Sequence, residues 1–146
     1  MDVGRAQAIQ DPITVMVGSR PLGGPLGIIA RHLFIEIPGQ GRWEMGPSGQ
    51  GKWISTTRAH DPASFSTAGD TQRAIDAGRV TWRAMVVSES GLNRGIANYD
   101  MTYVGPHYNA LSHNSNFAVR YVLREAGGEN IPTGLAPGFP DYDDSE

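Results

Sequence analysis

Tyr-Asn-Ala-Leu-Ser-His-Asn-Ser-Asn-Phe-Ala-Val-Arg-Tyr-Val-Leu-Arg-Glu-Ala-Gly, residues 108–127, is the most regular stretch of the chain. Its second half repeats apolar residues at the spacing of one helical face: Phe117, Ala118, Tyr121, Val122 and Ala126. Two glycines follow at 127 and 128, where a left-handed residue commonly closes a helix. The pattern therefore predicts a helix over residues 114–126.

The start of this helix is polar, with short polar side chains and a histidine over residues 112–116. Such residues are typical of helix caps, because they accept hydrogen bonds from the free N–H groups of the first turn. The same place also suits a nucleophile, since the helix dipole and those N–H groups stabilise developing negative charge. Ser115 is the candidate nucleophile, and the helix alone leaves both interpretations open.

Length and composition indicate one globular domain over residues 1–146, with loose ends at about 1–10 and 141–146. Hydrophobic content is 39%, and the net charge of −3 without a basic stripe argues against a nucleic-acid partner. No apolar run approaches the roughly 20 residues of a membrane span, and the N-terminus lacks a signal-peptide pattern. We therefore expect a soluble protein, either cytoplasmic or delivered by a secretion system. Cysteine is absent, which excludes thiolate catalysis and zinc–thiolate sites.

Alternation of apolar and polar residues predicts strands at 13–17, 28–37, 42–45 and 79–87, with Trp53 and Ile54 able to begin another. Glycine and proline predict a loop over 18–27, and helical segments are expected at 74–77 and from 88 to about 103. The expected fold is α+β: an antiparallel sheet with the helix of residues 114–126 packed across it. In the 28–37 strand, Leu33 and its apolar partners face the core, which places His32 on the more open face.

Ser115, His32 and Glu44 form the candidate catalytic set. A serine hydroxyl needs a base to take its proton, and a third group must hold that base in the right tautomer. His32 is the candidate base, and Glu44 the candidate third group, with Asn114 or a backbone carbonyl as alternatives. Glu44 is equally compatible with a solvated position at a strand edge. A metal site built from His32, Glu44 and a histidine at 107 or 113 matches no standard ligand spacing, so we predict neither a metal nor a cofactor.

These residues resemble the circularly permuted NlpC/P60 superfamily, the papain-like group that includes lecithin:retinol acyltransferase-like and PPPDE-type enzymes. The matching positions are His32 in Arg-His-Leu-Phe-Ile and Ser115 in Asn-Ser-Asn-Phe, with the segment beginning at Tyr108 also similar. The resemblance implies a hydrolase or acyltransferase acting on an amide or ester. It also implies that Asn114, Asn116, His113 and Tyr108 contact substrate.

The proline-rich tail of residues 132–139 is similar to bacterial domains with an Asn-Ser-Asn core, some of them carried by Rhs-type polymorphic toxins. If this chain is toxin-like, the resemblance implies a peptide, cell-wall or lipid substrate. An immunity or carrier protein is then a possible partner.

The family nucleophile is cysteine, whereas this chain has Ser115. A thiol with a pKa near 8.5 can be converted to a thiolate by a histidine and a helix end, but a serine hydroxyl requires general-base catalysis. Three explanations remain open: a natural serine enzyme, a scaffold that has lost catalysis, or a deliberately replaced cysteine. The second corresponds to an inactive papain-like binding or structural module, such as a toxin-associated or virion component.

Overall fold

The computed structural model describes residues 9–21, 31–47, 53–55, 66–103 and 115–132. In chain order its elements are β1 (Pro12–Pro21), β2 (Arg31–Ile37), β3 (Gly41–Trp43), β4 (Met45–Pro47), β5 (Trp53–Ser55), α2 (Ser66–Asp76), β6 (Thr81–Ser88), α3 (Glu89–Tyr103) and α4 (Ser115–Glu125).

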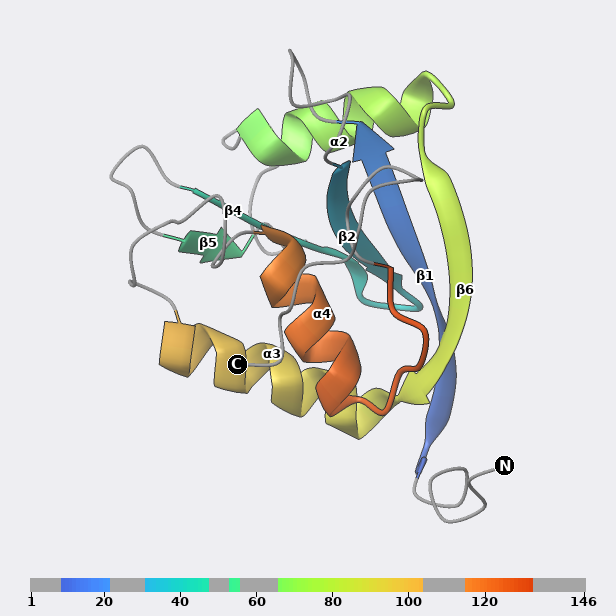
Figure 1. Ribbon diagram of the computed structural model, residues 1–146, viewed down its shortest axis with the longest axis vertical. Coiled ribbons are helices and arrows are strands. Elements are labelled where there is room, and N and C mark those ends of the chain that lie inside the picture. Colours follow the sequence, from blue (N-terminus) through green and yellow to red (C-terminus); the bar gives the residue numbers. More distant parts are fainter. Residues whose placement is uncertain (1–8, 22–30, 48–52, 56–65, 104–114, 133–146) are drawn as a thin grey trace.

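Four strands form an open antiparallel sheet in the order β3-β2-β1-β6 (Figure 1). A separate two-stranded sheet joins β4 to β5. The expected α+β class with an antiparallel sheet is therefore confirmed, and so is the strand predicted to begin at Trp53. The helices predicted near 74–77 and 88–103 are also present, the first as the longer helix α2.

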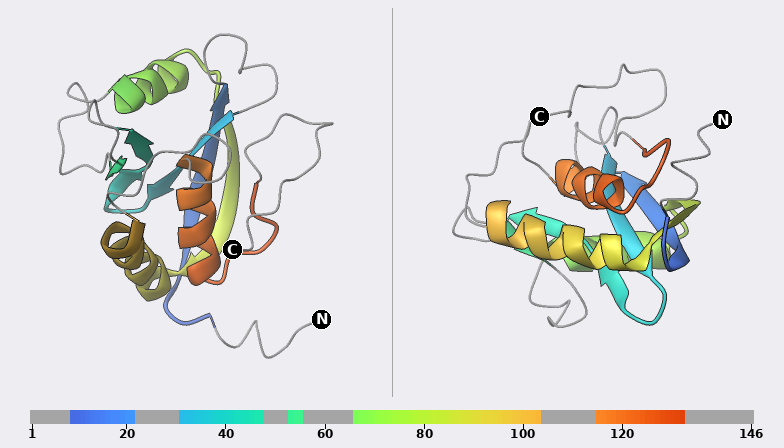
Figure 2. Two further views of the ribbon diagram at one scale, coloured as in Figure 1. Left: turned by 60° about the vertical axis from the view of Figure 1, so that its left-hand side comes forward. Right: turned by 90° about the horizontal axis from the view of Figure 1, so that it is seen from below.

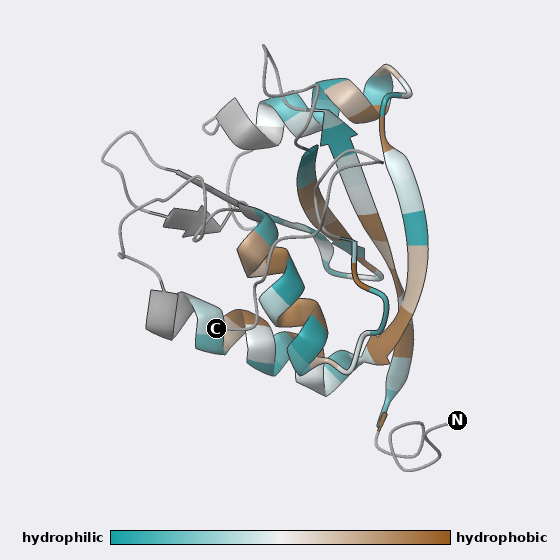
Figure 3. Ribbon diagram, in the orientation of Figure 1, coloured by the Kyte–Doolittle hydropathy of each residue, from teal (hydrophilic) through white to brown (hydrophobic). Residues whose placement is uncertain are grey.

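Helices α3 and α4 cover one face of the sheet, while α2 lies across the end where β1 stops (Figures 1 and 2). The core between α4 and the sheet contains the apolar residues predicted for one helical face, and hydrophobic positions recur along α4 in Figure 3. Leu33, Ile35 and Ile37 of β2 belong to this core, as alternation predicted.

Close packing of α3 on α4 explains two glycines that weaken the helical pattern of α3. A Cβ atom at Gly91 would lie 3.0 Å from the Cα of Ala126, and one at Gly95 would lie 3.3 Å from the Cα of Val122. Larger side chains would push the helices apart. These glycines lower the helical propensity of α3, but they allow α3 and α4 to pack more closely.

Both ends of the α3–α4 unit are closed by residues adjacent in sequence. Ser88 Oγ accepts the N–H of Gly91 at 3.0 Å, which is a standard cap of the first turn of α3. At the end of α4, Gly127 has a φ of 81° and donates to the carbonyl of Arg124, while Gly128 donates to that of Leu123. This pair of bonds is the Schellman motif expected from the two glycines.

Strand β1 extends further than its sequence predicts, because residues 18–21 of the expected loop belong to the strand, and residues 22–27 lie outside the described part of the chain. Residues 18–21 pair with β2, and Gly18 and Ser19 also pair with β6. A Cβ atom at Gly18 would lie 2.3 Å from the ring of Phe34, so the glycine makes room for an aromatic ring on the next strand. The prediction of a loop from residue 18 was wrong because glycine here serves packing rather than a turn.

Candidate functional site

His32 and Glu44, twelve residues apart, meet inside the protein. His32 lies on β2, and Glu44 lies where the chain leaves β3 before β4. The Nε2 of His32 is 2.7 Å from the Oε1 of Glu44, and Glu44 is 0% exposed. The structure thus brings together the predicted base and its predicted orienting group, and the alternative of a solvated glutamate at a strand edge is wrong.

The predicted exposure of His32 also needs correction. His32 projects to the face opposite Leu33, as alternation required, but it is only 2% exposed. Alternation shows which residues share a face, not whether another element covers that face. Here α2 lies at the end of the sheet that carries His32, and its buried Thr71 bonds Glu44, the partner of His32.

Three residues that the sequence did not single out complete the polar cluster around Glu44. Thr71 Oγ1 donates to Glu44 Oε1 at 2.8 Å, and the buried Arg20 donates from Nε to Thr71 Oγ1, also at 2.8 Å. Arg42 Nε lies 2.8 Å from Glu44 Oε2 as an ion pair without the alignment of a hydrogen bond. We call these residues, with His32, the Glu44 cluster.

Sequence signals for the additional members are weak. Thr71 lies three residues before the buried Ala74, a spacing that places both on one helical face. Arg20 sits in a glycine- and proline-rich stretch with no periodicity, and it is separated from Thr71 by 51 residues. Such a contact depends on the folded arrangement of β1 and α2.

Electrostatics favour a neutral imidazole beside a carboxylate. Burial lowers the pKa of His32, and the positive charges of Arg20 and Arg42 add to this effect, while Glu44 opposes it. Burial alone would raise the pKa of Glu44, but hydrogen bonds from His32 and Thr71 and the charge of Arg42 outweigh it, and the pKa is lowered. Near pH 7 the pair is therefore neutral His32 with ionised Glu44, which is the state a general base requires.

Asn116 joins the start of α4 to the strand that carries His32. Its Oδ1 accepts the backbone N–H of Leu33 at 2.8 Å, and its Nδ2 donates to the carbonyl of Arg31 at 2.7 Å. β3 pairs with β2 only at residues 35–37, so the amide takes the place of a neighbouring strand at this edge. Both amide groups of Asn116 thus join α4 to β2, and the substrate contact predicted for this residue stays a prediction.

Ser115 is the first residue of α4, directly before Asn116, and its side chain lies outside the described part of the chain. The other predicted substrate-contacting residues, Tyr108, His113 and Asn114, also lie outside the described residues. Helix α4 packs on the Leu33 face of the sheet, whereas the side chain of His32 projects to the opposite face.

Within the described ranges, no group of three or more His, Cys, Asp or Glu residues is placed to hold a metal ion. The histidines at 107 and 113, which the metal hypothesis would have used, are outside those ranges. In the same part of the chain, no helix has the length and hydrophobicity needed to cross a membrane.

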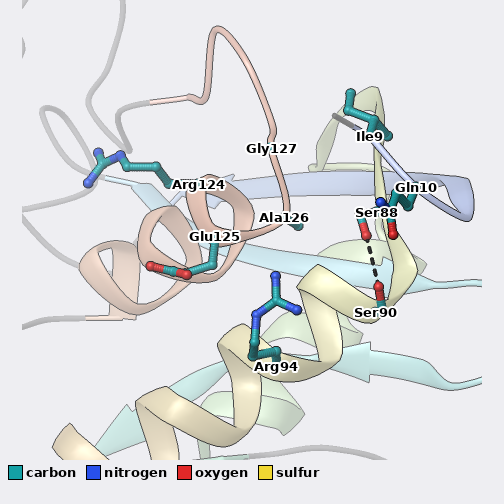
Figure 4. A pocket seen from close by; sticks show the side chains of 9 residues that line it. All are labelled: Ile9, Gln10, Ser88, Ser90, Arg94, Arg124, Glu125, Ala126 and Gly127. Atoms are coloured by element: carbon teal, nitrogen blue, oxygen red, sulfur yellow. Dashed lines mark hydrogen bonds between the residues drawn. The ribbon is translucent and has the colours of Figure 1, made fainter. Parts of the chain in front are cut away.

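An open pocket of about 380 Å³ lies away from the Glu44 cluster, between the start of α3 and the end of α4 (Figure 4). Ser88 and Ser90 line one wall and Ala126 and Gly127 another, and the side chain of Arg94 points into the space between them. The adjacent Asp11 already bonds the N–H of Ser90 at 2.9 Å, so a carboxylate of the protein itself occupies this helix end.

Comparisons with known proteins leave the resemblance to the permuted NlpC/P60 superfamily as a prediction. No protein-family model, no curated protein and no solved structure matches this chain.

Proposed function

We propose that the protein is a hydrolase or acyltransferase that attacks an amide or ester through Ser115, with His32 as general base and Glu44 as its orienting group. The observation that carries the proposal is the buried 2.7 Å contact between His32 Nε2 and Glu44 Oε1. A catalytic base needs such a partner to fix its ring and stabilise the charge it gains. The order of strand histidine and helix serine along the chain supports the same assignment.

The proposed reaction proceeds by the usual steps of acyl transfer to a serine. The Oγ of Ser115 bonds to the carbonyl carbon while its proton passes to His32. His32 then returns that proton to the leaving amine or alcohol as the bond to the leaving group breaks. Water, or an acceptor alcohol or amine, releases the acyl group from Ser115 by the reverse proton transfers, so serine and histidine are regenerated.

Two features of the described fold support these roles. The first is the serine at the start of α4, since the N–H groups of a helix N-terminus stabilise a developing oxyanion. Asn116 ties that turn to the backbone on either side of His32, and this link supports a site shared by the start of α4 and β2. The resemblance to toxin-borne domains suggests that the substrate is a peptide, a cell-wall component or a lipid. It also suggests an immunity or carrier protein as the partner.

Labelling with a fluorophosphonate probe followed by peptide mass spectrometry tests the proposal. An adduct is expected at Ser115, absent in Ser115→Ala and formed at least about 100-fold more slowly in His32→Gln, given the usual contribution of general-base catalysis. Circular dichroism of each variant verifies folding. Absence of an adduct at Ser115, or equal labelling rates in folded His32→Gln, would refute the mechanism.

The second candidate is a non-enzymatic binding or structural module that retains the papain-like arrangement. Two observations favour it: the chain has no cysteine, and His32 is 2% exposed. Ser115→Cys separates the candidates. Hydrolysis of an activated ester by this variant alone indicates a disabled site, whereas hydrolysis by the wild-type protein supports a serine enzyme.

A further inference from the structure

We propose that Arg20 and Thr71 are positioning residues that fix the direction of the hydrogen bonds described for the Glu44 cluster. In this arrangement His32 carries its proton on Nε2 and presents an unprotonated Nδ1. The catalytic consequence of this inference rests on the proposed function, but the arrangement of protons does not, and it can be measured on an inactive protein.

The order of donors and acceptors is set first by Arg20, because its guanidinium has only donors and remains protonated in proteins. Its Nε donates to Thr71 Oγ1 at 2.8 Å, so the hydroxyl oxygen is the acceptor there. A hydroxyl has a single hydrogen. Thr71 directs that hydrogen to Glu44 Oε1, 2.8 Å away.

Glu44 Oε1 thereby accepts from Thr71 and meets His32 Nε2 at 2.7 Å. Its other oxygen lies beside the positive charge of Arg42 at 2.8 Å, so both oxygens face donors or cations and the carboxylate is ionised. An ionised carboxylate has no hydrogen to give. The proton between the two residues must therefore sit on Nε2 of His32, and in the neutral ring Nδ1 holds the lone pair.

The position of the cluster argues for a role beyond stability. Arg20, His32, Glu44 and Thr71 come from β1, β2, the β3–β4 connection and α2, and none is more than 6% exposed. Buried ionic groups carry a large desolvation cost, and well-packed apolar residues are commonly as stable in their place. Donors that converge on the Glu44 carboxylate give that cost a purpose, since the ionised carboxylate selects one tautomer of the predicted base.

Nitrogen-15 NMR of the histidine ring tests the inference on wild-type protein and two variants at pH 7.5. In the wild type we expect a neutral His32 ring with hydrogen on Nε2 and slow exchange of that hydrogen with water. Thr71→Val keeps the shape of the side chain but removes the donor, and Nε2–H exchange should accelerate at least about tenfold, as expected for loss of a hydrogen bond to a charged group. Thr71→Ser restores the hydroxyl and should restore the wild-type rate.

Exchange of the backbone N–H of Val15, in the core of β1, separates positioning from general loosening. It should be unchanged in Thr71→Val when the effect is confined to the cluster. A wild-type ring protonated on Nδ1 or on both nitrogens overturns the inference. If the Nε2–H of His32 exchanges as slowly in Thr71→Val as in the wild type, Thr71 has no positioning role. The same conclusion follows if exchange at the Val15 N–H accelerates equally.

Failure of the proposed function gives a different result. Absent labelling of Ser115 together with a protected Nε2–H would refute the enzyme and leave the proton arrangement intact. If Ser115 does label, Thr71→Val should lower the labelling rate and Thr71→Ser should restore it.

Discussion

Asn116→Ala is expected to destabilise the protein by more than any ordinary surface substitution in a helix. The amide is the described link between the first turn of α4 and the edge of β2. Its removal leaves the N–H of Leu33 and the carbonyl of Arg31 without these partners. Leu33 is 0% exposed, so water cannot readily replace the lost acceptor.

The magnitude follows from the two backbone groups. An unsatisfied buried donor costs about 1–3 kcal/mol, and the carbonyl of the half-buried Arg31 lies at the low end of the same range. Alanine recovers up to about 0.7 kcal/mol through its higher helix propensity. The expected net loss in the free energy of unfolding is therefore about 1.5–4 kcal/mol, a large part of the 5–15 kcal/mol typical of a domain.

Urea unfolding followed by tryptophan fluorescence measures this loss, with Asn93→Ala as the control. Asn93 is an exposed asparagine of α3, and its removal should change stability by no more than about 0.5 kcal/mol. Asn116→Asp adds a sharper condition, because it keeps an acceptor for Leu33 but faces the carbonyl of Arg31 with an oxygen. Stability within 0.5 kcal/mol of wild type in either Asn116 variant would refute the proposed link.

Three further expectations concern packing and protonation. Gly18→Ala should lower stability by about 1–3 kcal/mol, because the new Cβ would lie 2.3 Å from the Phe34 ring, and Phe34→Leu should recover part of the loss in thermal melts. Gly91→Ala should destabilise the protein, because the new Cβ would press on α4. Gly69→Ala in α2 should instead stabilise it by about 0.5–1 kcal/mol in urea unfolding, because the nearest atom to the new Cβ is the flexible end of an arginine at 3.4 Å. The unfolding free energy should fall as pH drops below about 6.5, because the unfolded chain protonates His32 there while burial lowers the pKa of His32 in the native state. His32→Gln should flatten the dependence of the unfolding free energy on pH between about pH 6.5 and 5. An unchanged dependence in this variant would contradict the expectation.

Periodicity predicted α4 and the strands that build the core, because repeated contacts require repeated residue types, and a polar helix start at residues 88–90 predicted α3. The helix α4, the strands β2 and β6 and the helix α3 were all expected, within a few residues of their observed bounds. Gly91 and Gly95 lower the helical propensity of α3, and the reason for their presence becomes visible only when α4 lies against it.

The candidate site was only partly predictable for a related reason. His32 and Glu44 were selected by residue type and order, and their contact was expected if neighbouring strands paired. Arg20 and Thr71 were not selected, because a buried arginine and a buried threonine on separate elements leave no local pattern. The bond of Asn116 to β2 was not predicted for the same reason, since an amide that bonds a strand 83 residues away leaves no pattern in the sequence near it.

One feature of the backbone accounts for two contacts of β2, that of His32 with Glu44 and that of the strand edge with Asn116. β3 ends at Trp43 and the chain leaves the main sheet at Glu44, before β4 joins the second sheet with β5. This departure frees Glu44 to reach His32 instead of continuing as a strand along β2. It also leaves the N–H of Leu33 and the carbonyl of Arg31 open to Asn116, which brings in the start of α4. A β3 that paired with the whole of β2 would occupy that edge, and the helix carrying Ser115 would have no strand backbone to bind beside the histidine.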